Sequence, residues 1–155
     1  MYCTANYNWV LKDRLALGDA ESASDIATLR KNRIQAIITA RNTLSRDDYG
    51  KHKIDILHLP LSDHHNSNIG KYFVPMWDFV ERHMKQGHRV LIHCKAGISR
   101  SVTLVLAYLM RKCHLRLPQA LEMIRNVRQC ANPNPGFLQQ LQVYESILEK
   151  FGYYK

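Results

Sequence analysis

Short apolar runs alternate with longer amphipathic segments along this chain. Runs at residues 9–11, 15–18, 35–39, 54–59 and 90–92 are flanked by polar or turn-forming residues, as is typical of strands. The intervening and following segments, residues 68–85, 102–113, 118–127 and 137–151, carry apolar residues at helical spacing. Strands that alternate with helices predict an α/β fold. We expect a central, mostly parallel, twisted sheet of about five strands, flanked by helices on both faces.

Local signals refine several of these elements. Ser22 is expected to cap the first helix, with Asp25 three residues later in the capping-box position. Pro75 falls in the first turn of the helix over 68–85, where its missing N–H costs little. Residues 41–50 are polar and predict a loop. The last helix is expected to bury one stripe of apolar residues: Phe137, Leu141, Tyr144, Leu148 and Phe151.

Length and composition predict a single domain over residues 1–155. At 46% apolar residues, the chain has enough hydrophobic material for a core without disulfide or metal support. No apolar run reaches the ~18 residues that cross a bilayer, so no membrane span is expected. The N-terminus also lacks the features of a signal peptide. The four cysteines show no metal-type spacing, which favours a reducing compartment, the cytosol or the nucleus.

The net charge of +9 favours anionic partners. A basic surface for nucleic acid or membrane is one interpretation, and general solubility with attraction of phosphoprotein substrates is the other. The basic residues are spread along the chain rather than gathered in one block. We therefore favour the second interpretation and do not expect nucleic-acid binding.

Candidate chemistry is concentrated after the apolar run 90–92. The chain continues as His-Cys-Lys-Ala-Gly-Ile-Ser-Arg-Ser over residues 93–101, and an apolar helix follows. A strand, a tight loop and a helix start form an anion cradle of backbone N–H groups backed by the helix dipole. A thiol at Cys94 is expected to have a lowered pKa there, and Arg100 can grip two phosphoryl oxygens. This pattern indicates phosphoryl transfer to sulfur.

The stretch 93–101 resembles the Cys-x5-Arg-Ser/Thr loop of cysteine-dependent protein phosphatases, and most closely that of the dual-specificity branch. The alternative for an isolated cysteine is a buried structural thiol, which His93, Gly97 and the Arg-Ser pair disfavour. The resemblance implies hydrolysis of phosphotyrosine and phosphoserine or phosphothreonine through a phosphocysteine. It implies Cys94 as nucleophile, Arg100 as phosphate ligand and Ser101 as the group that stabilises the departing sulfur.

Asp63 is the candidate general acid. It lies in the polar loop that follows the run 54–59, at the sheet edge expected to carry Cys94. It also stands 31 residues before Cys94, the interval usual in the dual-specificity branch. Asp47, Asp48 and Asp55 fit less well, because they fall in a surface loop or within a strand.

The remaining site residues surround this constellation. His93 is expected to orient the loop through hydrogen bonds, and Gly97 to allow close approach of phosphate. Residues 127–137 resemble the family's segment that packs beside the phosphate loop. The expected phosphate-binding set is Lys95, Ala96, Gly97, Ile98, Ser99 and Arg100.

No cofactor or metal is expected, because the cradle itself supplies positive field for the transition state. His58, His64 and His65 lack the carboxylate-plus-histidine spacing of a metal site. The expected partners are a phosphorylated protein and, in the site, a phosphate or sulfate ion.

Other functions stay open at this point. A phosphoinositide or RNA 5′-phosphatase can use the same loop, although Ile98 stands where the former carry a second lysine, and the loop lacks the Asn-Arg-Thr-Gly ending of the latter. A non-catalytic phosphoresidue-binding module is a further alternative, but such relatives usually lose the cysteine. A reversible disulfide from Cys113 or Cys130 to Cys94 is also possible.

Overall fold

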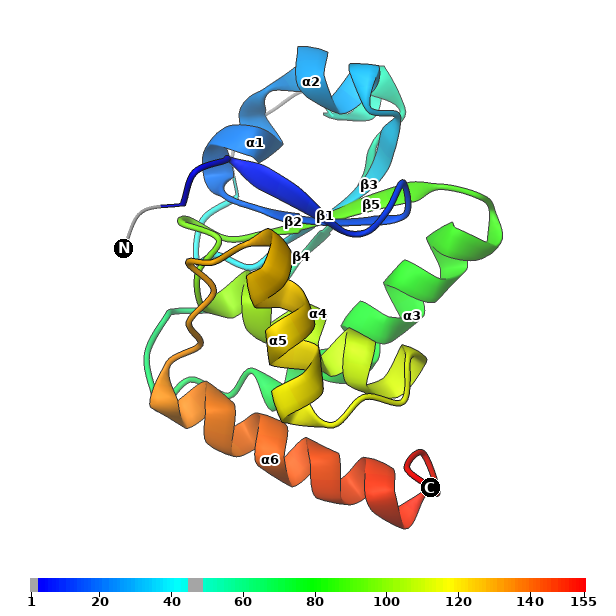
Figure 1. The fold of residues 1–155 in the computed structure, drawn as a ribbon. Helices are drawn as coiled ribbons and strands as arrows, with labels where there is room; N and C mark the ends of the chain where they lie inside the picture. Colours follow the sequence, from blue (N-terminus) through cyan, green and yellow to red (C-terminus); the bar gives the residue numbers. More distant parts are fainter. Residues whose placement is uncertain (1–2, 45–48) are drawn as a thin grey trace.

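One five-stranded sheet organises the structure, a computed structural model that describes residues 3–44 and 49–155 (Figure 1). The strands are β1 (Tyr7–Leu11), β2 (Leu15–Gly18), β3 (Ile34–Thr39), β4 (Asp55–His58) and β5 (Arg89–His93). Their order across the sheet is β1-β2-β5-β3-β4. β1 pairs antiparallel with β2, and all other neighbours are parallel. The prediction of a mostly parallel sheet of about five strands is confirmed.

Helices cover both faces of the sheet, as predicted. The pair α1 and α2 lies on one face, and the other four lie on the opposite face (Figure 1). No helix in the described ranges has the length and apolar character needed to cross a bilayer. The helices are α1 (Ala20–Ser24), α2 (Ile26–Lys31), α3 (Phe73–Lys85), α4 (Arg100–Lys112), α5 (Leu117–Val127) and α6 (Pro135–Lys150), with 3₁₀ turns η1 (Tyr49–His52) and η2 (Gly70–Tyr72).

Side chains alternate between two hydrophobic clusters along each central strand. In β5, Ile92 joins the larger cluster under α3–α6, while Leu91 joins the smaller one under α1 and α2. In β3, Ile38 and Ile37 divide in the same way. A register slip of one residue would exchange the two faces, so burial on both sides fixes the pairing. It thereby fixes the end of β5, where the candidate loop begins.

Helix α4 is the most deeply buried helix, because all residues from 101 to 110 are buried. Each fully buried Leu, Val or Met side chain contributes about 1.5–3 kcal/mol relative to exposure. This burial anchors the N-terminus of α4 directly after the loop that leaves β5.

The predicted cap at Ser22 is wrong. Two short helices occupy this region, and an aspartate caps each of them. Asp19 accepts a hydrogen bond from the backbone N–H of Ser22 at 2.9 Å, and Asp25 accepts one from Thr28 at 3.0 Å. Ser22 lies inside α1 and donates its hydroxyl to the Asp19 carbonyl. Aspartate side chains are favoured N-caps of helices. The two caps divide into two helices a segment for which the sequence pattern predicted one.

The predicted apolar stripe of the last helix is correct except at its end. Phe151 is 77% exposed, because α6 ends at Lys150 and the chain turns at Gly152, whose φ is +78°. Of the predicted polar loop over 41–50, Asp47 and Asp48 lie outside the described residues.

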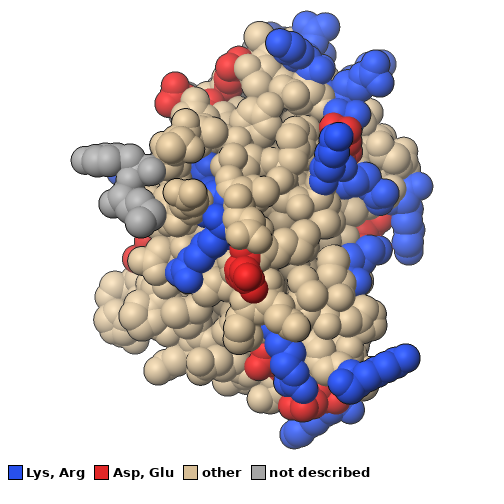
Figure 2. Space-filling model, viewed as in Figure 1, with Lys and Arg blue, Asp and Glu red and all other residues tan. Residues whose placement is uncertain are grey.

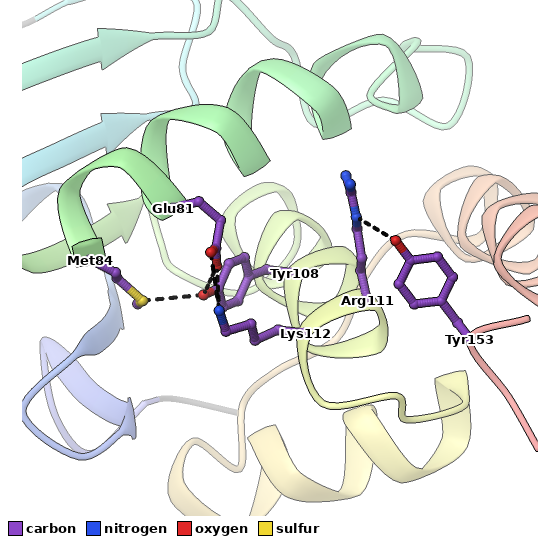
Figure 3. Close-up of polar contacts among 6 residues, drawn as sticks. All are labelled: Glu81, Met84, Tyr108, Arg111, Lys112 and Tyr153. Atoms are coloured by element: carbon purple, nitrogen blue, oxygen red, sulfur yellow. Dashed lines mark hydrogen bonds and ion pairs between the residues drawn. The ribbon is translucent and has the colours of Figure 1, made fainter. Parts of the chain in front are cut away.

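A hydrogen-bonded group ties α3 to α4 (Figure 3). The hydroxyl of the fully buried Tyr108 donates to Glu81 at 2.8 Å, and the Lys112 ammonium lies 2.9 Å from the same carboxylate oxygen. Partial burial raises the pKa of Glu81, but the bonds from Lys112 and Tyr108 and nearby positive charge outweigh it, so the pKa lies below its ordinary value. Beside this group, Arg111 stacks on Trp77 and donates to Tyr153, which secures the C-terminal tail.

We predict that Tyr108→Phe lowers the free energy of unfolding by about 1–2 kcal/mol at pH 7, because the buried bond to a charged acceptor is lost. A carboxylate with a depressed pKa stabilises the fold above its unfolded-state pKa, and that contribution disappears as the pH falls through the folded-state value. The difference between wild type and variant should therefore shrink below pH 4.5. Urea denaturation at pH 7 and at acid pH measures it.

Tyr7→Phe is the matched control, because no residue in the described ranges bonds the Tyr7 hydroxyl, and its stability should be unchanged. An equal loss in the two variants, or a loss for Tyr108→Phe that is independent of pH, would contradict the assignment.

Candidate active site

The loop between β5 and α4, residues 94–99, turns all of its carbonyl groups outward. Each carbonyl accepts a hydrogen bond from the surrounding protein. The donors, in loop order, are His93 Nδ1, the Ala20 N–H, Arg128 Nη2, Arg128 Nε, the Asn132 N–H and the N–H and hydroxyl of Thr103. Since the C=O and N–H of a trans peptide point in opposite directions, the N–H groups of this loop face inward.

These inward N–H groups are available to a ligand. The N–H of Gly97 lies 3.3 Å from the Cys94 sulfur. Those of Lys95, Ala96, Ile98 and Ser99 have no acceptor within the described ranges. Converging N–H groups at the start of a helix form a site for an anion with several oxygens. The loop predicted to bind phosphate thus has the geometry of an anion cradle.

Cys94 lies at the floor of this cradle. It is 2% exposed, and its sulfur is 3.1 Å from the hydroxyl of Ser101 in the first turn of α4. The fully buried Ser101 and the Gly97 N–H therefore both face the sulfur and can donate to it when it carries negative charge.

Arg100, the first residue of α4, joins the cradle to the neighbouring loop. Its Nη1 donates to the carbonyl of Leu61 at 2.9 Å. Its Nε is buried and has no partner in the described part of the chain. A buried guanidinium N–H without an acceptor is costly, and an oxyanion in the cradle would satisfy it.

Asp63 lies in the loop that Arg100 contacts, and its side chain is exposed. One carboxylate oxygen accepts a hydrogen bond from the amide of Asn134 at 2.9 Å. Asn134 also caps α6 and donates its backbone N–H to the Ser99 hydroxyl at 3.0 Å. The candidate acid and the phosphate loop are therefore connected through one asparagine, which sequence reasoning placed only in a packing segment.

Gly136 completes this connection. A Cβ at this position would overlap the backbone carbonyl of His65, so only glycine lets the loop of Asp63 pack directly on the start of α6.

His93 occupies a structural position beneath the loop. The buried ring donates from Nδ1 to the Cys94 carbonyl at 3.2 Å, since a carbonyl can only accept, and its Nε2 lies 2.8 Å from the Thr39 hydroxyl. These bonds orient the ring and hold the peptide of Cys94.

Arg128 is the main residue that the sequence reading missed. It is 2% exposed, and its guanidinium donates to the carbonyls of Gly97 at 2.8 Å, Ala96 at 3.2 Å and Ala5 at 2.9 Å. Burial lowers the pKa of Arg128, against the opposing influence of nearby negative groups. A buried, fully engaged arginine that holds loop carbonyls is a positioning residue. In the sequence, this role is indicated only by the position of Arg128 in the segment 127–137, which is expected to pack beside the phosphate loop.

Gly97 is required where Arg128 meets the loop. Its φ is +66°, and a side chain there would collide with the Arg128 guanidinium and with the Gly18 carbonyl.

The cysteines pair differently from the expectation of free thiols. Cys3 and Cys130 form a disulfide, with Cα atoms 5.3 Å apart. Cys113 is free and follows the last residue of α4, about 20 Å along the helix from the phosphate loop. Burial raises its pKa. In this structure neither residue is bonded to Cys94, since Cys130 pairs with Cys3 and Cys113 lies at the far end of α4.

No group of three or more metal-binding side chains occurs in the described ranges. His64 and His65 stack on one another with ring centroids 4.2 Å apart, and His58 bonds the carbonyl of Arg41.

Comparison with known proteins agrees with this geometry. The model of the family described as "Dual specificity phosphatase, catalytic domain" matches residues 15–147. The chain belongs to the dual-specificity phosphatase family. The match runs from β2 into α6 and so contains every candidate site residue.

Individual relatives support the assignment. A probable rhodanese domain-containing dual specificity protein phosphatase of Dictyostelium discoideum is 40% identical over 139 residues, which are 90% of this chain and 29% of the relative. Dual specificity protein phosphatase 22 of Mus musculus is 36% identical over 84% of this chain and 70% of its own length. The crystal structure of DUSP15 superposes with a TM-score of 0.83 at 34% identity, covering 94% of this chain and 97% of that one. The chain thus spans less than a third of the first of these relatives and most of the other two.

We predict that Arg128→Lys weakens binding of orthovanadate, a phosphate analogue, at least about tenfold. The reason is that a lysine ammonium cannot replace a planar guanidinium that donates hydrogen bonds to several carbonyl groups at once. The kcat for p-nitrophenyl phosphate should fall in parallel. Inhibition constants and kinetics of the purified variant measure both. Arg125→Lys is the control, since the exposed Arg125 makes one bond, to Ala131, outside the loop. Wild-type inhibition by vanadate in Arg128→Lys would contradict a positioning role.

Proposed function

We propose that this chain is a cysteine-dependent protein phosphatase that hydrolyses phosphotyrosine and phosphoserine or phosphothreonine through a phosphocysteine intermediate. The observation that carries the proposal is the cradle itself. Inward N–H groups surround a buried sulfur, and the unpartnered Nε of Arg100 lies beside them. Membership of the family gives independent support.

In the first step, the N–H groups of residues 95–100 and the guanidinium of Arg100 bind the phosphoryl oxygens. The Cys94 thiolate attacks phosphorus in line with the leaving oxygen. A P–S bond forms as the P–O bond breaks, and Asp63 gives its proton to the departing ester oxygen, which leaves as a hydroxyl. Asn134 holds Asp63 by its carboxylate, which keeps the acid next to the loop.

In the second step, the ionised Asp63 takes a proton from water, and the resulting nucleophile attacks phosphorus. The P–S bond breaks, inorganic phosphate leaves, and the sulfur departs as thiolate. Ser101 and the Gly97 N–H, 3.1 Å and 3.3 Å from the sulfur, stabilise that charge. In this mechanism the fixed N–H groups and Arg100 supply the positive field, so no metal or cofactor takes part.

We also propose that the protein acts in a reducing compartment, the cytosol or the nucleus. The proposal rests on Cys94, because oxidation of a nucleophilic thiol abolishes attack on phosphorus. In such a compartment the Cys3–Cys130 disulfide is open to exchange with cellular thiols.

Neither alternative on the same fold gains a specific observation. Ile98, where a phosphoinositide phosphatase would carry a second loop lysine, brings no charge to the cradle. A module that only binds phosphoresidues has no use for a hydroxyl directed at the sulfur.

Hydrolysis of p-nitrophenyl phosphate tests the proposal. Cys94→Ser should lower kcat by about 10³-fold or more, because the nucleophile is lost. Ser101→Ala should retain the first step and slow the second, so that a burst of nitrophenol precedes a steady rate lowered by about tenfold or more. Rapid-mixing absorbance follows both phases. Full activity in Cys94→Ser would disprove the phosphocysteine route.

We predict that Asp63→Asn has an effect that depends on the leaving group. With a phosphotyrosine or phosphothreonine peptide, kcat should fall about 10²-fold, because an alcohol or phenol of high pKa needs a proton as it leaves. With p-nitrophenyl phosphate the loss should be less than about tenfold, because nitrophenolate leaves without help. Asp78→Asn, on the exposed side of α3, is the control and should match wild type on every substrate. Equal losses on both substrates would assign the acid to another residue.

A further inference from the structure

A basic groove lies at the edge of the sheet opposite the candidate active site. The loop of Cys94 follows the carboxyl end of β5, whereas the groove lies where β3, β4 and β5 begin. It is a depression of about 480 Å³. Its lining residues are Arg30, Arg33, Ile34, Gln35, His52, Gly87 and Arg89.

The fold concentrates charge at this edge that is scattered in the sequence. Because β2, β3, β4 and β5 run parallel, the segments that precede them meet on one side. Lys and Arg side chains are dense in the upper right of Figure 2, over α2 and the starts of these strands. The segments carry Lys12, Arg14, Arg30, Lys31, Arg33, Lys51, Lys53, Arg82, Lys85 and Arg89.

Two guanidinium groups of the groove have no anionic partner. Arg30 and Arg33 are exposed, and neither side chain forms an ion pair or hydrogen bond within the described ranges. Within the described ranges, two carboxylates at this edge are already engaged: Asp13 pairs with Arg89 at 3.3 Å, and Asp55 bonds His83 and Arg82. Like charges around one recess repel each other, and a bound anion relieves that repulsion.

A third arginine, Arg89, also lines the groove, but its charge is already partly neutralised by Asp13. Arg89 lies over the ring of Trp9 and donates to the Asn32 carbonyl at 3.2 Å, so Arg30 and Arg33 are the two groove arginines that remain for a ligand. The φ of Arg33 is +56°. Glycine or asparagine adopts this conformation with less strain than arginine, so the backbone conformation does not favour an arginine at this position.

We propose that this groove docks an acidic segment of the protein substrate, at a distance from the phosphorylated residue. A guanidinium group binds a carboxylate through two parallel hydrogen bonds, which suits the side chains of Asp and Glu. Nucleic acid is less suited, since single-stranded ligands need aromatic stacking platforms and the lining offers only His52. A membrane is less suited, because the exposed large apolar residues, such as Val74, Val143 and Phe151, lie on other elements.

The separation of the two sites fixes the spacing in the substrate. β3 is six residues long, so the sheet is about 20 Å deep from the groove to the cradle. An extended chain covers about 3.3 Å per residue, so a straight line between the sites needs about six residues, and a path around the surface of about twice that length needs about twelve residues between the acidic segment and the phosphoresidue. The substrate part of the proposal rests on the proposed phosphatase function, whereas binding of the acidic segment does not.

The first experiment measures binding without catalysis. A fluorescein-labelled, unphosphorylated peptide of about ten residues rich in Glu is titrated with the protein at low salt, and anisotropy gives Kd. Arg30→Gln/Arg33→Gln should weaken binding about tenfold or more. Lys150→Gln/Lys155→Gln removes the same net charge at the far end of the chain and should leave Kd within about twofold. Equal weakening in both variants, or no binding by wild type, would overturn the proposal that the groove binds an acidic segment.

The second experiment measures the gain in catalysis. A phosphotyrosine peptide carries a tail of about six Glu on a Gly-Ser linker of about twelve residues, and is compared with a Gln tail and with a linker of about three residues. We expect a KM lowered several-fold only for the Glu tail on the long linker, with unchanged kcat, and loss of that gain in Arg30→Gln/Arg33→Gln. An equal KM for all peptides would overturn docking of the substrate.

The two proposals fail separately. Turnover of p-nitrophenyl phosphate is the readout of the phosphatase, and it should be equal in wild type and both double variants, since their positions lie outside the cradle. Labelled oligothymidylate and phosphatidylserine vesicles complete the series. Tighter, Arg30- and Arg33-dependent binding of either one than of the acidic peptide would assign the groove to that class of partner instead.

Discussion

The site depends on the orientation of six peptide groups. From Cys94 to Ser99 every carbonyl is bonded to the protein outside the loop, so the N–H groups have no direction left but inward. A buried N–H group without a hydrogen-bond acceptor is energetically costly. The helix dipole at the start of α4 adds to the positive potential of these N–H groups. The cradle keeps its shape because the carbonyl groups on its outer side are all hydrogen-bonded. Its capacity to bind an anion is therefore built into the fold.

Arg128 and Asn134 show how distant segments support that arrangement. Arg128, at the end of α5, holds two loop carbonyls and reaches the N-terminal segment through the Ala5 carbonyl. Asn134, at the start of α6, joins the phosphate loop to the carboxylate of Asp63. The chain after α5 thus contributes no candidate catalytic group, yet it determines where the loop of Cys94 and the loop of Asp63 meet.

The parallel sheet separates two kinds of positive site. At the carboxyl ends of the strands, positive character comes from backbone N–H groups and one arginine around a deep sulfur. At the opposite edge it comes from exposed side chains on the segments that precede the strands. The same topology that brings the candidate catalytic groups together also collects the basic residues at the other end. A net charge of +9 is consequently not spread evenly over the surface.

Much of this was readable from the sequence. Alternation within the strands and helical spacing after them predicted the two-faced sheet, and the stretch 93–101 predicted an anion loop around Cys94, because those signals are local. The caps at Asp19 and Asp25, the exposure of Phe151, the pairing of Cys3 with Cys130 and the bonds of Arg128 were decided by the tertiary structure. They depend on which segments meet in space, some more than a hundred residues apart. For the same reason the basic groove has no local signature: parallel strands bring its arginines together, and spacing along the chain does not.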